Sequence, residues 1–189
     1  MLIDISMKIT KAMFDNTVTD KALVGHIGTH FDVMDENFPL EYTKRVGIVF
    51  DVSEVANRDV HICDVDLDKV KEDMFVAFYS GYCENVSYEE KGYFISHPQL
   101  STELIEALVE KKISIIGLDF AGIRRGNEHI PMDRYCAQHK VFVVENLREL
   151  KKLLEYKNFT VYTFPMNVEG VTGLPCRVVA RTENTKVSD

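Results

Sequence analysis

The sequence of 189 residues has few cysteines, and their spacing excludes two common uses of thiols. Its four cysteines lie far apart, and no two of them form a Cys-x-x-Cys pair. Zinc ribbons and redox dithiols are built on such pairs, so neither is indicated. We expect reduced and mostly buried thiols at Cys63, Cys83, Cys136 and Cys176.

The sequence also lacks a long apolar run and an excess of positive charge. No apolar run approaches the roughly 20 residues that span a bilayer, and Asp4 and Lys8 interrupt the apolar start where a secretory signal would be continuous. The formal net charge is −8, whereas binding to a phosphate backbone needs a basic face. We therefore expect a cytoplasmic protein that binds neither nucleic acid nor membranes.

No internal repeat, low-complexity tract or linker rich in Pro, Gly and Ser divides the chain. At 46% hydrophobic residues, a chain of this length buries one sizeable core. We predict a single domain over residues 1–181, followed by a polar tail over residues 182–189.

Seven short apolar runs, rich in β-branched and aromatic residues, predict strands. They are Leu2 to Ile5, Val46 to Val52, Met74 to Tyr79, Ile113 to Leu118, Val141 to Val144, Phe159 to Phe164 and Cys176 to Ala180.

Two segments between these runs have helical periodicity. Ser101 is suited to cap a helix in which Leu104, Ile105, Leu108 and Val109 form one apolar stripe. A second helix is predicted from Asn146, where leucines repeat at helical spacing as far as Leu154. Strands that alternate with helices indicate an α/β domain with some parallel pairing.

The segment from His26 to Asp32 is the densest group of potential metal ligands, with the sequence His-Ile-Gly-Thr-His-Phe-Asp. In an extended chain, alternation puts His26, His30 and Asp32 on one face and Phe31 on the other. A flat strand would hold the two histidines roughly 13 Å apart, at about 3.3 Å per residue. Both can bind one ion only if the chain bends.

Gly28 is the residue that best allows such a bend, and its missing side chain would also leave room for an ion and a water. Imidazole nitrogen together with carboxylate oxygen suits zinc or manganese, because calcium and magnesium prefer oxygen alone. From the residues alone, an alternative is that one histidine is a hydrogen-bonded core residue and the other is exposed.

The segment resembles the His-x-Gly-Thr-His-x-Asp signature of the cyclase family, which includes bacterial kynurenine formamidases and isatin hydrolases. Further resemblance follows in the family's order along most of the chain. These blocks are residues 3–6, 46–53, 96–101, 116–119 and 143–147, and finally Glu169-Gly170 with Gly173 and Pro175. The resemblance implies a swivelling β/β/α fold and assembly as a homodimer or homotetramer.

The resemblance also implies a metal centre. One divalent ion, zinc or manganese, would be held by His26, His30, Asp32 and Glu145, and a second ion is usual nearby. In the family the signature continues with a proline and then with a histidine that donates and accepts protons. Here these positions hold Met34 and Glu36. A glutamate whose pKa is raised by burial can still transfer a proton, so Glu36 is the candidate catalytic residue.

A second departure from the family lies twelve residues before Glu145, where a histidine usually serves the second metal and this chain has Asp133. Three hypotheses remain open. Asp133 binds a hard ion such as manganese or magnesium through oxygen, the second site is empty, or Arg134 pairs with Asp133 or Glu36 and replaces the cation.

Other residues are candidates for the wall of a substrate pocket. Phe14 precedes the signature, where the family has an aromatic residue. Arg124 or Arg125, in a polar loop that runs to His129, is suited to meet an anionic group of a substrate. We expect a structural role for His97, and surface or hydrogen-bonded roles for His61 and His139.

The resemblance implies hydrolysis of an amide bond in a small molecule, with N-formylkynurenine, which yields kynurenine and formate, as the family's best-known substrate. Two alternatives remain. One is a catalytically altered or inactive member that binds a metal or a small molecule, and the other is a hydrolase of a cyclic amide or ester.

Overall fold

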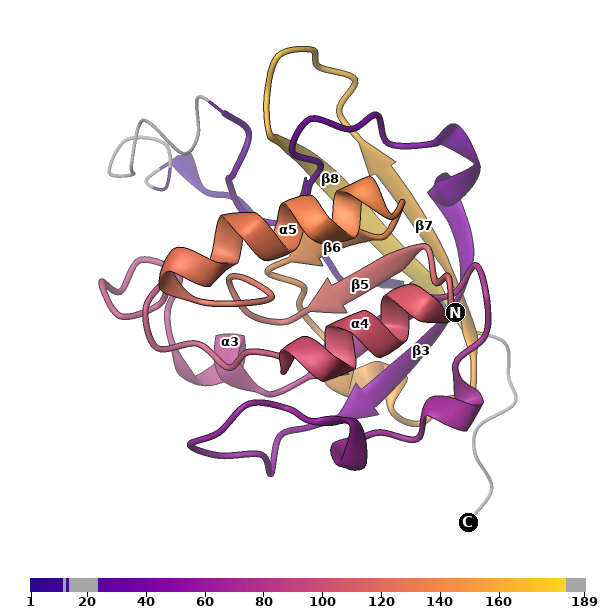
Figure 1. Ribbon diagram of the computed structural model, residues 1–189. Coiled ribbons are helices and arrows are strands. Elements are labelled where there is room, and N and C mark those ends of the chain that lie inside the picture. Colours follow the sequence, from indigo (N-terminus) through magenta and orange to yellow (C-terminus); the bar gives the residue numbers. More distant parts are fainter. Residues whose placement is uncertain (12, 14–23, 183–189) are drawn as a thin grey trace.

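One mixed sheet of eight strands forms the centre of the protein (Figure 1). The computed structural model describes residues 1–11, 13 and 24–182. The strand order is β1-β8-β2-β6-β5-β4-β3-β7, and β7 also pairs with β8, so that seven strands close into a ring. The strands are β1 (Leu2–Asp4), β2 (His30–Asp32), β3 (Lys44–Asp51), β4 (Phe75–Tyr79), β5 (Ile115–Leu118), β6 (Phe142–Glu145), β7 (Phe159–Pro165) and β8 (Gly173–Arg181).

Strands β3, β4, β5 and β6 are parallel neighbours, whereas β2, β7 and β8 pair antiparallel. Parallel neighbours need long crossover connections, which here contain the helices of the fold. Each of the seven predicted runs coincides with a strand, and the α/β prediction is confirmed. The three-residue strand β2 was not among the predicted runs.

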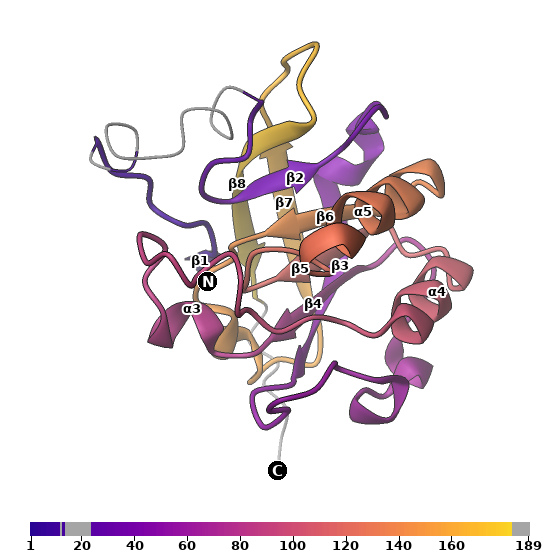
Figure 2. The ribbon, with the colours of Figure 1, turned by 60° about the vertical axis from the view of Figure 1, so that its left-hand side comes forward.

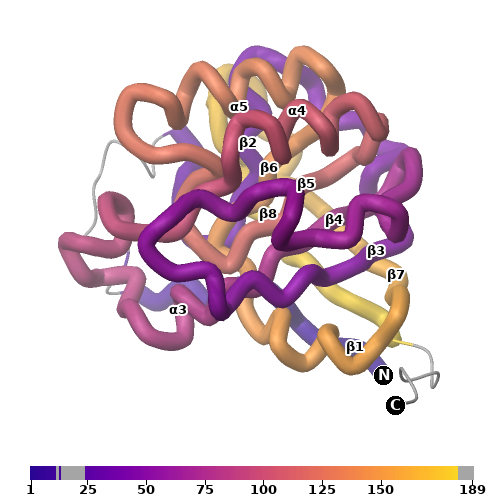
Figure 3. The backbone as a smooth tube through the Cα atoms, turned by 60° about the horizontal axis from the view of Figure 1, so that its bottom comes forward, coloured from indigo at the N-terminus to yellow at the C-terminus, as the bar shows by residue number. Residues whose placement is uncertain are grey.

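The described helices are α3 (Tyr82–Asn85), α4 (Thr102–Glu110) and α5 (His129–Gln138). Helices α4 and α5 lie side by side against the outer face of the parallel strands (Figures 1 and 3). Figure 2 shows the ring from the side, with α3 at the end of the sheet opposite to β2. No helix within the described ranges is both long and apolar enough to cross a bilayer.

The parallel strands are buried on both faces, and so their side chains belong alternately to two cores. Along β4, Val76 and Phe78 pack with the apolar stripe of α4 outside the ring. Phe75 and Ala77 point to the inside of the ring, where they join Phe31 of β2. This alternation explains why continuous apolar runs predicted these strands.

Helix α4 follows the prediction closely. The Ser101 hydroxyl accepts a hydrogen bond from the Leu104 backbone N–H at 3.2 Å, as an N-cap does. All four residues of the predicted stripe are buried.

The helix predicted from Asn146 is wrong. Only a short 3-10 turn, Leu150–Leu153, forms there. The backbone N–H groups of Leu147 and Arg148 donate to the carbonyl groups of Leu118 in β5 and of Ile5 just after β1, so they are not available for a helical ladder. Asn146 also has a left-handed backbone, with φ of 59°. The leucines are buried inside the ring, and their spacing results from packing there rather than from a helix.

Helix α5 was not predicted from the sequence. Its buried residues are only Asp133, Cys136 and Ala137, so it has no apolar stripe that a periodicity search detects. The helix begins at His129 and therefore includes the end of the segment that we had assigned to a loop.

Candidate metal centre

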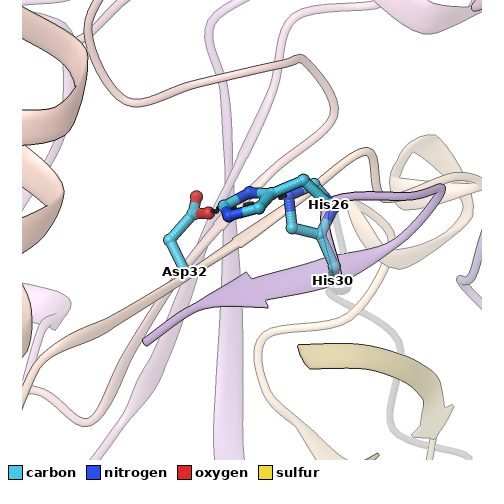
Figure 4. Close-up of side chains that lie close together, drawn as sticks. All are labelled: His26, His30 and Asp32. Atoms are coloured by element: carbon cyan, nitrogen blue, oxygen red, sulfur yellow. Dashed lines mark hydrogen bonds and ion pairs between the residues drawn. The ribbon is translucent and has the colours of Figure 1, made fainter. Parts of the chain in front are cut away.

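The backbone bends sharply between the two histidines of the signature. Gly28 has φ of +58°, a conformation that favours glycine. The bend brings His26 Nδ1 to 3.1 Å from His30 Nε2, instead of the roughly 13 Å of a flat strand. Figure 4 shows both rings directed toward Asp32. The predicted bend is confirmed.

Gly28 has a different packing role from the expected one. A Cβ at this position would lie 2.7 Å from Cγ1 of Ile9, so the space beside the glycine is filled by that side chain. It is therefore not room for an ion or a water. The requirement for glycine comes from the positive φ and from this close contact.

The register of β2 decides which residues face the centre. His30 lies opposite Glu145 of β6, and Phe31 lies opposite Val144. Because Phe31 and Val144 point into the ring, His30, Asp32 and Glu145 lie on the other face. The predicted separation of ligands from packing residues therefore holds along β2.

The distances among these side chains fit a shared cation. His26 Nδ1 lies 2.9 Å from Asp32 Oδ1, and His30 Nε2 lies 3.6 Å from the same oxygen. His30 Nε2 is also 3.6 Å from Glu145 Oε2. One ligand atom from each of His26, His30 and Asp32 falls within 4.8 Å of the other two.

A hydrogen bond fixes which nitrogen of His30 carries a proton, and a second contact orients the ring of His26. His30 Nδ1 lies 2.8 Å from the Gly28 carbonyl oxygen, which can only accept, so this nitrogen carries the proton. His26 Nε2 lies 2.9 Å from Thr172 Oγ1. When these two N–H groups donate, His30 Nε2 and His26 Nδ1 present their lone pairs to the centre, as metal ligands do.

Asp32 supplies the negative charge of the cluster and is almost completely buried. Burial alone would raise the pKa of Asp32, but its contacts with His26 and His30 outweigh burial and hold that pKa well below the usual range. Asp32 is therefore a carboxylate in the folded protein, and its buried negative charge favours a cation at this place.

A second group of ligands lies on the other side of Asp32. Asp133 of α5 is completely buried, and neither of its carboxylate oxygens has a hydrogen-bond partner among the described residues. Burial, together with the charge of Asp32, raises the pKa of Asp133 well above its usual value. His129 Nε2 lies 3.4 Å from Asp133 Oδ2 and 4.0 Å from Glu145 Oε1. Ligand atoms of Asp32, His129 and Asp133 lie within 4.8 Å of one another.

From the sequence, His129 was expected at the end of a loop in the pocket wall and not as a ligand. A usable signal was present, because His129 and Asp133 are four residues apart and share one face of a helix. The signal was missed because the segment was assigned to a loop.

Glu36 lies outside this cluster. Its carboxylate forms an ion pair with Lys140, and it lines a neighbouring hollow together with Phe38 and Val168. Met34 has φ of +53°, which the proline of the family signature cannot adopt. The backbone after Asp32 thus follows a course that a proline at this position would exclude, and the geometry does not bring Glu36 to the imidazoles.

Three further candidate residues were Arg134, Arg124 and Phe14. The Arg134 side chain approaches Asp35, with Nε 3.5 Å from Oδ2, so no contact with Asp133 or Glu36 supports the replaced-cation hypothesis. Arg124 bonds Asp59 and Glu128, and the neighbouring Arg125 lines the pocket instead. Phe14 lies outside the described residues.

The pocket beside the cluster has a volume of about 490 Å³, which suits a small organic molecule. Apolar side chains and basic side chains share its wall with the candidate ligands. The lining residues are Val24, His26, His30, Met34, Phe94, His97, Ala121, Arg125, Gly126, His129, Ile130, Arg134, Glu145 and Thr172.

Comparison with known protein families identifies the chain. Residues 3–124, which include His26, His30 and Asp32, match the family described as putative cyclase. The chain belongs to the cyclase family. A search of curated proteins finds no match.

Solved structures related to this cyclase-family chain share its fold at low sequence identity. Isatin hydrolase A from Ralstonia solanacearum has a TM-score of 0.78 and 16% identity, with 97% of this chain and 92% of that chain covered. A potential metal-dependent hydrolase with cyclase activity has a TM-score of 0.74 and 21% identity, with coverage of 97% and 99%. A predicted metal-dependent hydrolase from Bacillus stearothermophilus has a TM-score of 0.72 and 20% identity, with coverage of 95% and 97%.

Proposed function

We propose that this protein is a metal-dependent hydrolase that cleaves an amide bond in a small molecule. The observation that carries the proposal is the convergence of one ring nitrogen each from His26 and His30 with the buried carboxylate of Asp32. A divalent ion bound there would lower the pKa of a water molecule toward neutrality and polarise the carbonyl group of the substrate.

The residues of the chain have separate tasks in this proposal. Nδ1 of His26, Nε2 of His30 and the carboxylate of Asp32 hold the ion, and Glu145 faces His30 from the next strand. The Gly28 carbonyl and the Thr172 hydroxyl hold the rings in orientation. Such supporting hydrogen bonds are typically worth a factor of about 10 to 100 in metal affinity.

The pocket favours an aryl amide that carries an anionic group. Phe94 and Ile130 give its wall an apolar surface, and Arg125 and Arg134 add positive charge. An aromatic ring packs on the first two residues, and a carboxylate pairs with the arginines. N-formylkynurenine has both groups, so an arylformamidase-like activity is our first choice. A cyclic amide such as isatin is the alternative substrate, since three of the related structures are isatin hydrolases.

Proton transfer is assigned to Glu36, whose carboxylate must leave Lys140 to reach the pocket. This separation favours a second candidate function. A member of the family that binds a metal and a small molecule without turning it over would keep the first cluster and lose the acid–base group.

The proposal is tested by removing the metal and by His30→Ala. Purified protein is stripped with a chelator, reloaded with Zn²⁺ or Mn²⁺, and assayed on N-formylkynurenine and isatin. We expect hydrolysis only after reloading, and His30→Ala to reduce it by at least about 10²-fold, because several kcal/mol of charge stabilisation are lost.

His139→Ala is the matched control. This exposed histidine at the end of α5 has Nδ1 2.8 Å from the Tyr135 carbonyl, and replacing it should leave activity unchanged. Hydrolysis that survives complete removal of metal would contradict the proposed function. Bound metal without hydrolysis of any amide or ester would favour the second candidate function.

A further inference from the structure

We propose that His129 takes the place of the histidine that the family has where this chain has Asp133, and that it binds the second divalent cation together with Asp32 and Asp133. The inference rests on the proposed function only in that the two sites share Asp32. It assigns a role to an imidazole that the resemblance to the family did not select. The experiment that tests it gives different results when this proposal fails and when the proposed function fails.

The geometry of the second group matches that of the first. One ligand atom from each of Asp32, His129 and Asp133 lies within 4.8 Å of the others, the same limit that the first cluster meets. His129 and Asp133 are one turn apart on α5, so the helix holds both side chains on the same face. Asp32 reaches the group from β2.

The protonation of His129 is set for ligation. Its Nδ1 lies 3.0 Å from the carbonyl oxygen of Arg124 and must donate there. Nε2 therefore presents a lone pair to Asp133 and Glu145. A lone pair on this nitrogen and a carboxylate oxygen both accept, so the two atoms have no attraction for each other without a proton or a cation between them.

The backbone keeps room for this ring. Gly122 has φ of +129°, and a Cβ there would lie 2.5 Å from His129 Nδ1. Any larger residue at 122 would displace the imidazole. The position of His129 thus depends on a glycine from the loop that follows β5.

Neither nearby arginine pairs with Asp133 in the described part of the chain. Asp133 is completely buried, and its two oxygens lack hydrogen-bond partners in the described part of the chain. Arg124 is paired with Asp59 and Glu128, and Arg134 approaches Asp35 at the surface. Because a buried carboxylate without a partner is costly, a divalent cation is the group that best completes the site.

The donor set indicates which ion binds. One imidazole nitrogen and carboxylate oxygens suit Mn²⁺ or Zn²⁺, whereas Ca²⁺ and Mg²⁺ prefer oxygen ligands alone. We expect Mn²⁺ to bind well, since this second site has more oxygen and less nitrogen than the first.

The experiment is a titration of metal-free protein with Mn²⁺ by calorimetry, together with metal analysis after dialysis. We expect two equivalents per chain for the unchanged protein. In His129→Ala and in the near-isosteric His129→Asn, the first equivalent should remain, and the affinity for the second should fall by at least about tenfold to a hundredfold. His139→Ala on the same helix should match the unchanged protein.

Three results would overturn or separate the proposals. Two equivalents with unchanged affinity in both His129 variants would overturn the role of His129. A single equivalent in the unchanged protein, lost in His30→Ala, would overturn the second site and leave the proposed function standing. No bound metal at all would overturn both. Thermal unfolding with chelator present shows whether each variant is folded, and His129→Asn preserves the size of the side chain if His129→Ala is unstable.

Discussion

Asp32 is the residue on which both groups of candidate ligands converge. It lies 2.9 Å from His26 Nδ1 on one side, and it belongs to the cluster with His129 and Asp133 on the other. A carboxylate has two oxygens, and each can face a different ion. Loss of Asp32 would therefore affect both sites, whereas loss of His26 or His129 would affect one.

A substitution of Glu36 tests whether this residue takes part in catalysis. If it transfers protons, Glu36→Gln should reduce hydrolysis by about 10²- to 10⁴-fold, the usual worth of general acid–base catalysis. Metal content should stay unchanged, because Glu36 lines a different hollow from the ligands. Steady-state kinetics and metal analysis of the same preparation check both statements.

Lys140→Met is the informative companion to that variant. It removes the cation that holds the Glu36 carboxylate, so hydrolysis should be maintained or increased. Full activity in Glu36→Gln would remove this residue from the mechanism and would leave the acid–base group to be sought among the residues of the pocket.

The short strand β2 positions two of the candidate metal ligands, His30 and Asp32. Its three residues pair with both β6 and β8. Phe31 is completely buried in the ring, which anchors the strand, and the neighbouring His30 and Asp32 are thereby held on the opposite face. A shift of one residue in register would exchange these faces and destroy the cluster.

The N-cap of helix α4 is expected to contribute to the stability of the protein. Ser101→Ala removes the acceptor for the Leu104 N–H, so the free energy of unfolding should fall by about 1 kcal/mol. Metal binding should not change, because α4 contributes no residue to the pocket. Urea unfolding of the chelated protein measures the loss.

Ser96→Ala is a suitable control for that measurement, because this serine is exposed and lies outside α4. Equal stability of Ser101→Ala and the unchanged protein would show that the cap contributes nothing to folding.

For the whole molecule, the closed ring leaves one apolar area of surface near the β7–β8 turn. Leu40 is 79% exposed, Phe164 is 62% exposed and Met166 is 56% exposed, and all three line the hollow that also contains Glu36. Exposed apolar residues grouped in this way are typical of contact surfaces between proteins. The prediction of a homodimer or homotetramer places its interface here.

That prediction is tested by light scattering coupled to size exclusion. The unchanged protein should elute at two or four times the 21.7 kDa of one chain, and Phe164→Asp should shift it toward the monomer because it puts a charge in an apolar contact. Ile62→Asp, at an exposed apolar residue in a separate turn, is the control. A monomeric unchanged protein would contradict the prediction.

Seven strands, helix α4 and the candidate ligands His26, His30 and Asp32 follow from local sequence. The strands are predictable because each is a short apolar run, and α4 because its apolar stripe and its cap lie within ten residues of each other. The bend at Gly28 was expected from the spacing of two histidines proposed to bind one ion. Glu145 and Asp133 were reached through resemblance to the family rather than through spacing.

By itself, the sequence determined the alternation of strands, the capped helix and the ligands of one bent segment, because each depends on residues close together in the chain. Only the tertiary structure decided that His129 lies beside Asp32, and that Glu36 pairs with Lys140. These contacts join residues about a hundred positions apart. They depend on the closure of the ring and on the position of α5, which no local pattern of apolar residues specifies.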